Sequence, residues 1–458
     1  MTIAAALNAL TQVLGDRLSQ SKSDLATHGA SETHFAAMPP DAVAYPRSTD
    51  EVAEIVKICA AHACPIIGFG AGTSLEGHTL ALHGGVALDF RDMAQVVDLQ
   101  AGDMIVRVQP GITREALNEE LRATGLFFPI DPGANASLGG MAATRASGTT
   151  AVRYGTMRDN VIALEVVLAD GRIIRTGSGA RKSSAGYDLT ALMVGSEGTL
   201  GLITELTLKL QGQPEAVAAA TCAFDTIDLA VQAVTATIGM GIPMARIEFL
   251  DAASVAAVNT YSNADIPETP HLMVEFHGSE TGVAEQAERF GEIASEHGGG
   301  AFEWATKPED RARLWQMRHH AYWAILASRK GATAVVTDVC VPISKLAQAV
   351  SETQADIDAS PIPAPILGHV GDGNFHAILL IDPDSAAERK AAQELSARMA
   401  QRALELGGTI TGEHGVGMGK LNYMRAEHGA GWDVMADIKR ALDPAGIFNP
   451  GKTVRLNG

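Results

Sequence analysis

The chain of 458 residues has far fewer basic than acidic side chains. Lys and Arg number 35 against 53 Asp and Glu, and the formal net charge is -18. Phosphate backbones and anionic lipid headgroups attract basic surfaces, which this composition does not favour. We therefore expect neither nucleic acid nor an anionic membrane surface as a partner. Any anionic substrate must find a local cation within an acidic protein.

Long apolar runs and cysteine motifs are also missing. No apolar stretch reaches the ~20 residues that a helix needs to cross a bilayer, so we expect no transmembrane segment. The four cysteines, mostly in apolar segments, suit core packing in a reducing compartment: Cys59, Cys64, Cys222 and Cys340. The first residues lack the basic start of an export signal and predict an amphipathic helix. We expect a cytoplasmic protein, or one peripheral to the inner membrane.

The length predicts at least two domains, because a single core rarely holds so many residues. The sequence pattern changes near residues 212–214. Before this point, glycine-rich turns alternate with strands and short helices. Asp170-Gly171, between two predicted strands, predicts a hairpin. Over residues 217–381, strands alternate with long helices, which predicts an antiparallel sheet covered by helices. The last of these predicted strands spans residues 366–381. We expect an α+β protein with three stretches, 1–212, 213–407 and 408–458.

Three turns rich in Gly, Ser and Thr lie within the first of these stretches, at residues 68–77, 131–140 and 195–201. Backbone N–H groups in such turns bind anions, and missing side chains permit close approach. The first turn begins a dinucleotide fingerprint, but Thr73 stands where its last glycine is needed, and no Walker lysine is present. A Rossmann or P-loop site is therefore disfavoured. Three such turns in succession favour a phosphate-bearing nucleotide over ordinary turns.

Two later glycine-rich turns, at residues 368–376 and 412–417, hold three imidazoles and two carboxylates. Two His and a Glu can bind a divalent metal that keeps open positions for a substrate. The glycines between His369 and His376 exclude a helix, and on one flat strand the two rings would face opposite ways. The intervening turn must therefore fold the chain back. The alternative is two satisfied loop histidines and a solvated Glu-His pair.

These motifs together resemble the vanillyl-alcohol-oxidase-type FAD flavoproteins. The resemblance spans nearly the whole chain and is carried by residues 70–77, 131–134, 139–143, 195–201, 368–376 and 412–417. Within that family the FAD-linked D-2-hydroxyacid dehydrogenases are most similar, and residues 338–344 resemble the cytochrome-type D-lactate dehydrogenases. The resemblance implies a two-lobed FAD-binding domain, completed by residues 408–458, and an α+β cap domain that binds the substrate.

The resemblance also implies the cofactor residues. Thr73 stands where some relatives carry a histidine that attaches the flavin, so non-covalent FAD is expected. The implied cofactor-binding residues are Pro65, Gly70, Ala71, Gly72, Thr73, Ser74, Leu75, Gly77, Pro132, Gly133, Ala134, Ser137, Gly139, Gly140, Ser147, Gly148, Glu197, Gly201, Ile203 and Asn449.

The catalytic roles follow from the same resemblance, which implies that His369, His376 and Glu413 bind a divalent Zn, Mn or Fe ion. His414 would be the general base, Arg318 would bind the substrate carboxylate, and Asn374 would add a hydrogen bond to the substrate. The implied reaction is metal-assisted oxidation of a short D-2-hydroxyacid, D-lactate above all, with hydride passing to flavin N5. Electrons would leave to an external cytochrome, quinone or electron-transfer flavoprotein. We expect a monomer or homodimer.

Alternatives remain at the level of substrate and reaction. Glycolate and D-2-hydroxyglutarate dehydrogenases are similar relatives, but Val336 stands where the 2-hydroxyglutarate branch has a lysine for the distal carboxylate. A monocarboxylate is therefore favoured. An alkyl transferase of this scaffold would carry a run of histidines where this chain has Glu413. A metallohydrolase without flavin would leave the glycine-rich turns unexplained.

Overall fold

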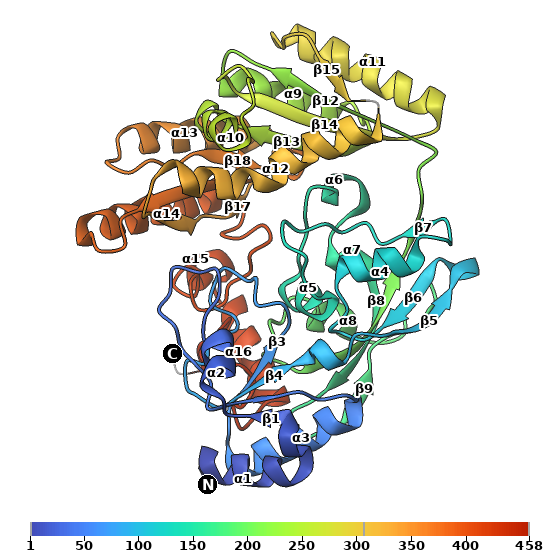
Figure 1. Ribbon diagram of the computed structural model, residues 1–458, viewed down its shortest axis with the longest axis vertical. Helices are drawn as coiled ribbons and strands as arrows, with labels where there is room; N and C mark the ends of the chain where they lie inside the picture. Colours follow the sequence, from blue (N-terminus) through green and yellow to red (C-terminus); the bar gives the residue numbers. More distant parts are fainter. Residues whose placement is uncertain (1, 306, 457–458) are drawn as a thin grey trace. The chain divides into compact units, whose positions relative to one another are not determined.

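The computed structural model describes residues 2–305 and 307–456 (Figure 1). The chain forms two compact units. Unit 1 comprises Met1–Ser147, Gly155–Gln213 and Glu413–Gly458, and unit 2 comprises Gly148–Tyr154 and Pro214–Gly412. Both units combine helices with β-sheet, which confirms the predicted α+β class.

Unit 1 begins with a four-stranded sheet in the order β1-β2-β4-β3. Ser48 caps α3 by accepting a hydrogen bond from the N–H of Glu51, and one helix face packs into the core through Val52, Ile55 and Cys59. The elements are α1 (Ile3–Leu14), β1 (Leu18–Ser19), α2 (Lys22–His28), β2 (Ala42–Ala44), α3 (Thr49–His62), β3 (Ile66–Phe69) and β4 (Val86–Asp89). The chain leaves β3 directly into the first glycine-rich turn.

A second, antiparallel sheet of unit 1 has the order β5-β6-β10-β8-β9. The hairpin predicted at Asp170-Gly171 is present between β8 and β9. The strands are β5 (Val96–Gln100), β6 (Ile105–Val108), β8 (Val161–Val167), β9 (Ile173–Arg175) and β10 (Leu202–Lys209), with β7 (Leu126–Phe127) paired to β11 (Gln211–Gly212). The helices are α4 (Arg114–Leu121), α5 (Leu138–Thr144), α7 (Met157–Asn160), α8 (Leu189–Met193), α15 (Met424–His428) and α16 (Gly431–Leu442).

Unit 2 is built on an antiparallel sheet in the order β15-β12-β14-β13-β18-β19-β16, with β17 also paired to β19. Its strands are β12 (Ala216–Ala223), β13 (Met244–Leu250), β14 (His271–Gly278), β15 (Glu303–Ala305), β16 (Thr333–Val336), β17 (Val339–Cys340), β18 (Ile366–Gly368) and β19 (Asn374–Ile381). Its helices are α6 (Ala151–Tyr154), α9 (Ile227–Gly239), α10 (Ala252–Ser262), α11 (Glu280–Glu296), α12 (Pro308–Ser328), α13 (Leu346–Asp358) and α14 (Ala386–Glu405).

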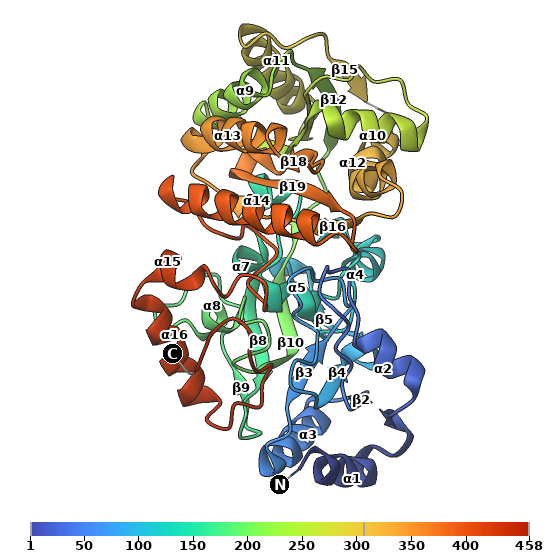
Figure 2. The same cartoon turned by 90° about the vertical axis from the view of Figure 1, so that its left-hand side faces the viewer.

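Helices cover both faces of this sheet. In Figure 2, α9 and α13 lie on one side of the strands, and α10 and α12 lie on the other. Along β19, Ala377 and Leu379 pack toward the α9 and α13 side, whereas Ile378 and Leu380 pack toward α12. Because side chains alternate along a strand, His376 also points to the α12 face.

The strand predicted over residues 366–381 is instead two strands separated by a one-turn 3₁₀ segment, Val370–Asp372. Gly373 follows this turn with φ of +80°, a conformation that a side chain disfavours. The chain therefore reverses between β18 and β19, which pair antiparallel. This reversal brings His369 and His376 onto neighbouring parts of unit 2.

Among the residues that the structure describes, no helix is both long enough and apolar enough to cross a bilayer.

Candidate active site

The first two glycine-rich turns meet in unit 1. A Cβ atom on Gly70 would lie 2.1 Å from Oγ of Ser137, and one on Gly139 would lie 2.5 Å from Cβ of Pro110. Neither glycine can take a side chain without displacing its neighbours. Gly72 adopts φ of +73°, so its conformation also favours glycine. Glycine at these positions therefore allows the two turns to pack closely together. Such a pair of turns can form a binding surface for an extended ligand.

Polar atoms in and beside the first turn support this binding surface. The hydroxyls of Ser74 and Thr79 are buried and have no hydrogen-bond partner among residues 2–305 and 307–456. Buried polar atoms are normally satisfied, so each orphan calls for a partner outside the chain. At Gly133 no heavy atom of the described chain lies within 4 Å of the position that a Cβ would occupy. Open space at a glycine and orphaned hydroxyls fit the expected FAD.

Glu197, from the third glycine-rich turn, holds the backbone that follows His414. Its carboxylate accepts hydrogen bonds from the N–H groups of Val416 at 2.7 Å and Gly417 at 2.8 Å, and from Oγ1 of Thr453 at 2.7 Å. These charge-assisted bonds are stronger than neutral ones. Glu197, predicted as a cofactor residue, therefore has protein partners and shapes the turn that carries His414.

The buried Glu197 carboxylate remains ionised. Burial alone would raise its pKa, but Nε2 of His78 lies 3.2 Å from Oε2, and the hydrogen bonds to Val416 and Thr453 add to this effect. Together these contacts outweigh the loss of hydration and lower the pKa of Glu197 to about 2. The Glu197 carboxylate therefore accepts the hydrogen bonds from Val416 and Gly417 over the whole physiological pH range.

Asn449 joins the same region of unit 1. Its amide Nδ2 donates to the carbonyl oxygens of His78 at 3.1 Å and Glu197 at 2.8 Å. Lys452 donates to Oδ1 of Asn449 at 2.6 Å and to the carbonyl oxygens of His78 and Leu80. Asn449, also predicted at the cofactor, thus ties the first turn to the third.

Glu413 and His414 lie half-buried at the start of the last stretch of unit 1. The hydroxyl of Ser147, at the end of the first stretch, donates to Oε2 of Glu413 at 2.7 Å. Two residues predicted for different groups, FAD and metal, are therefore direct neighbours. The predicted metal ligand thus has a fixed position within unit 1.

His369 and His376 lie together in unit 2. Their ring centroids are 5.5 Å apart and the rings are nearly perpendicular, at 84°. This confirms that the glycine-flanked turn folds the chain back and brings the imidazoles together. His376 is buried, whereas His369 is slightly more exposed.

The Nδ1 atom of each ring faces an oxygen acceptor. For His376 the acceptor is the carbonyl oxygen of Thr337, at 3.0 Å, and for His369 it is Oε1 of Glu248, at 2.8 Å. We assign the ring proton to Nδ1 from these partners, which leaves the lone pair on Nε2. Two neutral imidazoles in this tautomer are good ligands for a divalent metal. The residues present therefore fit the expected ion.

Arg318 points from α12 to the same carboxylate. Its Nε and Nη2 atoms lie 2.8 Å and 2.7 Å from Oε2 of Glu248. Arg318 is buried, with 8% of its surface exposed. Arg318, Glu248 and His369 thus form one continuous chain of contacts across unit 2.

Asn374 is held by neighbours of His376. Its Nδ2 donates to Oδ1 of Asp338 at 2.7 Å and to the carbonyl oxygen of Val339 at 2.8 Å. Oδ2 of Asp338 accepts from Oγ1 of Thr411 at 2.7 Å. The segment just before Glu413 is thereby anchored beside β19.

Sequence reasoning missed Glu248 and Asp338, the two carboxylates that orient these groups. Glu248 alternates with apolar residues in β13, and this pattern alone predicts a half-exposed strand. For Glu248 a usable signal was present, since an acidic residue between two apolar residues in a strand of a covered sheet needs a buried partner. Asp338 lies between β16 and β17, where no such pattern exists.

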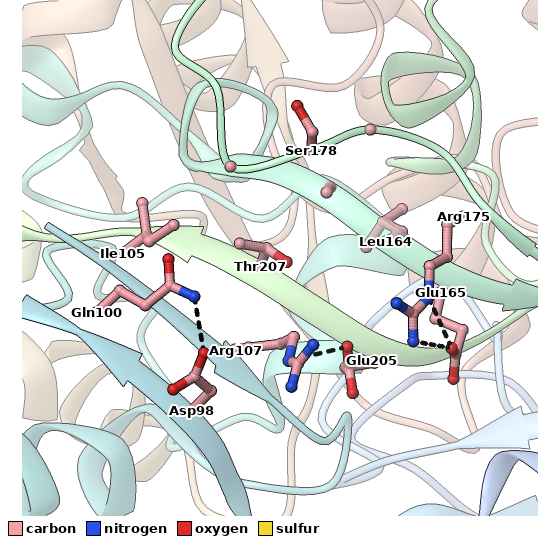
Figure 3. Close-up of a pocket in the computed structure, with 13 residues that line it drawn as sticks. Asp98, Gln100, Ile105, Arg107, Leu164, Glu165, Arg175, Ser178, Glu205 and Thr207 are labelled. Atoms are coloured by element: carbon pink, nitrogen blue, oxygen red, sulfur yellow. Dashed lines mark hydrogen bonds and ion pairs between the residues drawn. The ribbon is translucent and has the colours of Figure 1, made fainter. Parts of the chain in front are cut away.

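The hollow drawn in Figure 3 lies elsewhere, over the second sheet of unit 1, with a volume of about 200 Å³. Two ion pairs line it, Arg107 with Glu205 at 3.3 Å and Arg175 with Glu165 at 3.0 Å, and Asp98 accepts a hydrogen bond from Gln100. No residue that the sequence predicts for the site lines it. This hollow is a polar surface of the sheet, and none of the predicted cofactor, metal or substrate residues lies in it.

Comparisons with known families cover both parts of the chain. Residues 40–177 match the family model described as FAD binding domain. Residues 213–453 match the model described as FAD linked oxidases, C-terminal domain.

Individual relatives extend over nearly the full length. The chain is 51% identical to a Danio rerio protein named "Probable D-lactate dehydrogenase, mitochondrial", over 94% of this chain and 87% of the relative. It is 46% identical to the mitochondrial D-lactate dehydrogenase [cytochrome] of Arabidopsis thaliana, over 98% of this chain and 80% of the relative. The solved structure of 4-ethylphenol oxidase from Gulosibacter chungangensis superposes with a TM-score of 0.79 at 19% identity, over 98% of this chain and 97% of that one. This last likeness concerns the fold alone.

Proposed function

Because the chain belongs to the FAD-linked oxidases and has the vanillyl-alcohol-oxidase-type fold, we propose that it oxidises D-lactate, or a similar short D-2-hydroxyacid, to the 2-oxoacid. The predicted family is thereby confirmed. The names of the two D-lactate dehydrogenase relatives support this substrate. The observation that carries the chemistry is the pair of oriented imidazoles, His369 and His376, in unit 2.

We assign unit 1 to FAD and unit 2 to the substrate. Bound FAD would supply a two-electron acceptor for the Cα hydride, and a Zn, Mn or Fe ion would supply Lewis acidity toward the hydroxyl oxygen. Residues of the turns 70–77 and 131–140 would hold FAD, with Ser74 and Thr79 as donors to it. An external carrier such as a cytochrome, quinone or electron-transfer flavoprotein would then receive the electrons.

His369, His376 and Glu413 are the proposed metal ligands. Gly412, the last residue of unit 2, supports the assignment of Glu413. A Cβ on Gly412 would lie 2.2 Å from Nδ2 of Asn374 and 3.1 Å from Oδ1 of Asp338, so its backbone is packed beside β19. Glu413 is one peptide bond away, about 3.8 Å between Cα atoms. The proposed ligand therefore directly follows, in the sequence, a residue that packs beside β19.

His414 is the proposed general base. An imidazole has its ordinary pKa near working pH, so it can accept a proton and release it in each cycle. The hydrogen bonds from Val416 and Gly417 to Glu197 stabilise the turn in which His414 lies. His414 would take the hydroxyl proton, while the hydride leaves Cα and the hydroxyl carbon becomes a carbonyl.

Arg318 is the proposed partner of the substrate carboxylate. Asn374 stays a prediction as a substrate residue, because both hydrogens of its Nδ2 are already donated to Asp338 and Val339. The contacts of Arg318 with Glu248 use Nε and Nη2, and we assign Nη1 to the substrate. Val336 lies on β16 and packs on the α12 face, the face to which Arg318 belongs. An apolar side chain there favours a monocarboxylate over D-2-hydroxyglutarate. Glycolate is the alternative short substrate.

Anaerobic flavin reduction tests the proposal. We expect the purified protein to be yellow and its visible flavin absorbance to bleach with D-lactate more rapidly than with L-lactate, glycolate or D-2-hydroxyglutarate. Prior treatment with a chelator should slow the bleaching, and added Zn²⁺ or Mn²⁺ should restore it. A colourless protein, or bleaching that ignores all four acids, would contradict the proposal. The predicted cytoplasmic location stays a prediction, since the names of both relatives refer to mitochondria.

A further inference from the structure

Glu248 is a carboxylate with no access to solvent, at 0% exposure, in the middle of β13. Its neighbours Ile247 and Phe249 pack toward the α9 and α13 side of the sheet. Glu248 therefore points to the opposite side, toward α12. A buried carboxylate is costly unless charged and hydrogen-bonded partners surround it.

Both oxygens of Glu248 have such partners. Oε1 lies 2.8 Å from Nδ1 of His369, and Oε2 accepts from Nε of Arg318 at 2.8 Å. One carboxylate therefore binds a proposed metal ligand and the proposed substrate arginine at once. Both contacts are direct contacts between side chains, and all three residues belong to unit 2.

We infer that Glu248 is a positioning residue that sets the metal affinity of the site through His369. The inference deepens the proposed function and rests on it. A carboxylate acceptor at Nδ1 holds the imidazole in one tautomer, fixes the ring, and makes Nε2 a more basic ligand. The guanidinium of Arg318 balances the charge of this carboxylate.

The imidazole of His376 has a different hydrogen-bond acceptor at Nδ1. Nδ1 of His376 donates to the carbonyl oxygen of Thr337 at 3.0 Å, and the nearest carboxylate oxygen, Oδ1 of Asp338, lies 3.7 Å away. A carboxylate at hydrogen-bond distance from Nδ1 is therefore found at His369, at 2.8 Å, and not at His376. Removing the charge of Glu248 should weaken metal binding without removing any proposed ligand.

Glu275 provides a matched control. It is buried on the adjacent strand β14, and its carboxylate also contacts a histidine and an arginine, namely His277 at 2.8 Å and Arg246 at 3.5 Å. It contacts none of the proposed metal ligands in any interaction that the structure describes. Glu248→Gln and Glu275→Gln remove the same charge from neighbouring positions of one sheet.

The experiment measures Zn²⁺ affinity of the full-length, FAD-loaded protein by competition with a chelating indicator. FAD content and thermal unfolding are recorded for each variant. We expect Glu248→Gln to weaken Zn²⁺ binding by about 10–100-fold, the usual effect of losing such a partner. Glu275→Gln should stay within about twofold of wild type. The double variant Glu248→Gln/Arg318→Gln removes both charges and should keep the weakened affinity.

The double variant guards against misfolding, because it leaves no buried arginine without a counter-charge. If wild type binds Zn²⁺ and both variants lacking Glu248 bind it equally well, the inference is wrong while the proposed function stands. If wild type itself binds neither Zn²⁺ nor Mn²⁺, the metal part of the proposed function fails, and the inference fails with it. If Glu275→Gln weakens binding as much as Glu248→Gln, the effect is general to buried charge and the inference is also overturned.

Discussion

The carboxylate of Glu197 accepts a hydrogen bond from the backbone N–H of Val416 at a distance of 2.7 Å. The two residues are far apart in the sequence, yet both are buried in unit 1. Since Val416 follows His414 by two positions, this bond restrains the proposed base through its backbone. Glu197 can therefore affect catalysis without contacting the substrate.

Glu197→Gln should destabilise the protein at neutral pH, and it should change the response to acid. The folded pKa of about 2 lies below the ordinary value of 4.5. The carboxylate thus contributes stability that is fully present above pH 4.5 and is lost as the pH falls toward 2. Urea unfolding at a series of pH values measures this. The difference between wild type and variant should shrink from pH 5 to pH 2, and a constant difference would contradict the assignment.

Gly133→Ala should weaken FAD binding and leave the apoprotein unchanged. No heavy atom of the described chain lies within 4 Å of a Cβ at this glycine, so a methyl group would displace no described residue and would meet the proposed FAD. FAD titration of the apoprotein and thermal unfolding separate the two effects. Gly212→Ala, at an equally open glycine outside the proposed cofactor site, is the control. Equal FAD affinity in all three proteins would exclude Gly133 from the cofactor site.

Arg318→Lys should raise KM for D-lactate by about tenfold, on the order of 1.4 kcal/mol, with a smaller change in kcat. Lysine keeps the charge opposite Glu248 but loses the planar fork that suits a carboxylate. Arg318→Ala should instead destabilise the fold by about 3–5 kcal/mol, because Glu248 would be buried without its partner. Steady-state kinetics and urea unfolding distinguish these effects. An unchanged KM in Arg318→Lys would remove Arg318 from the substrate site.

Val336→Lys should shift the preference toward D-2-hydroxyglutarate. A lysine there would offer the second cation that the distal carboxylate needs, on the face of the sheet that α12 covers. The ratio of kcat/KM for D-2-hydroxyglutarate to that for D-lactate should rise about tenfold, or about 1.4 kcal/mol. Val335→Lys is the control, since Val335 packs on the opposite face. Equal ratios in both variants would argue against Val336 as a specificity residue.

The sequence predicted what local chemistry determines. The glycines beside Asp372 required a reversal, and the rings of His369 and His376 do meet. By contrast, the strand predicted over 366–381 was wrong in its middle, because an apolar run does not reveal a one-turn interruption. Glu248 was also missed, since its partners Arg318 and His369 are joined to it only by the folded sheet. Long-range hydrogen bonds leave no periodic trace in the sequence.

Strand β3 depends on residues made much later. The N–H of Ile66 donates to the carbonyl oxygen of Ile447 at 2.8 Å, and the N–H of Asn449 donates back to Ile66 at 2.9 Å. During vectorial synthesis on the ribosome, residues 214–412 emerge before these partners exist. The backbone pairing of β3 can therefore be completed only after residues 447–449 have been synthesised. The first glycine-rich turn, into which β3 leads, gains this support at the end of translation.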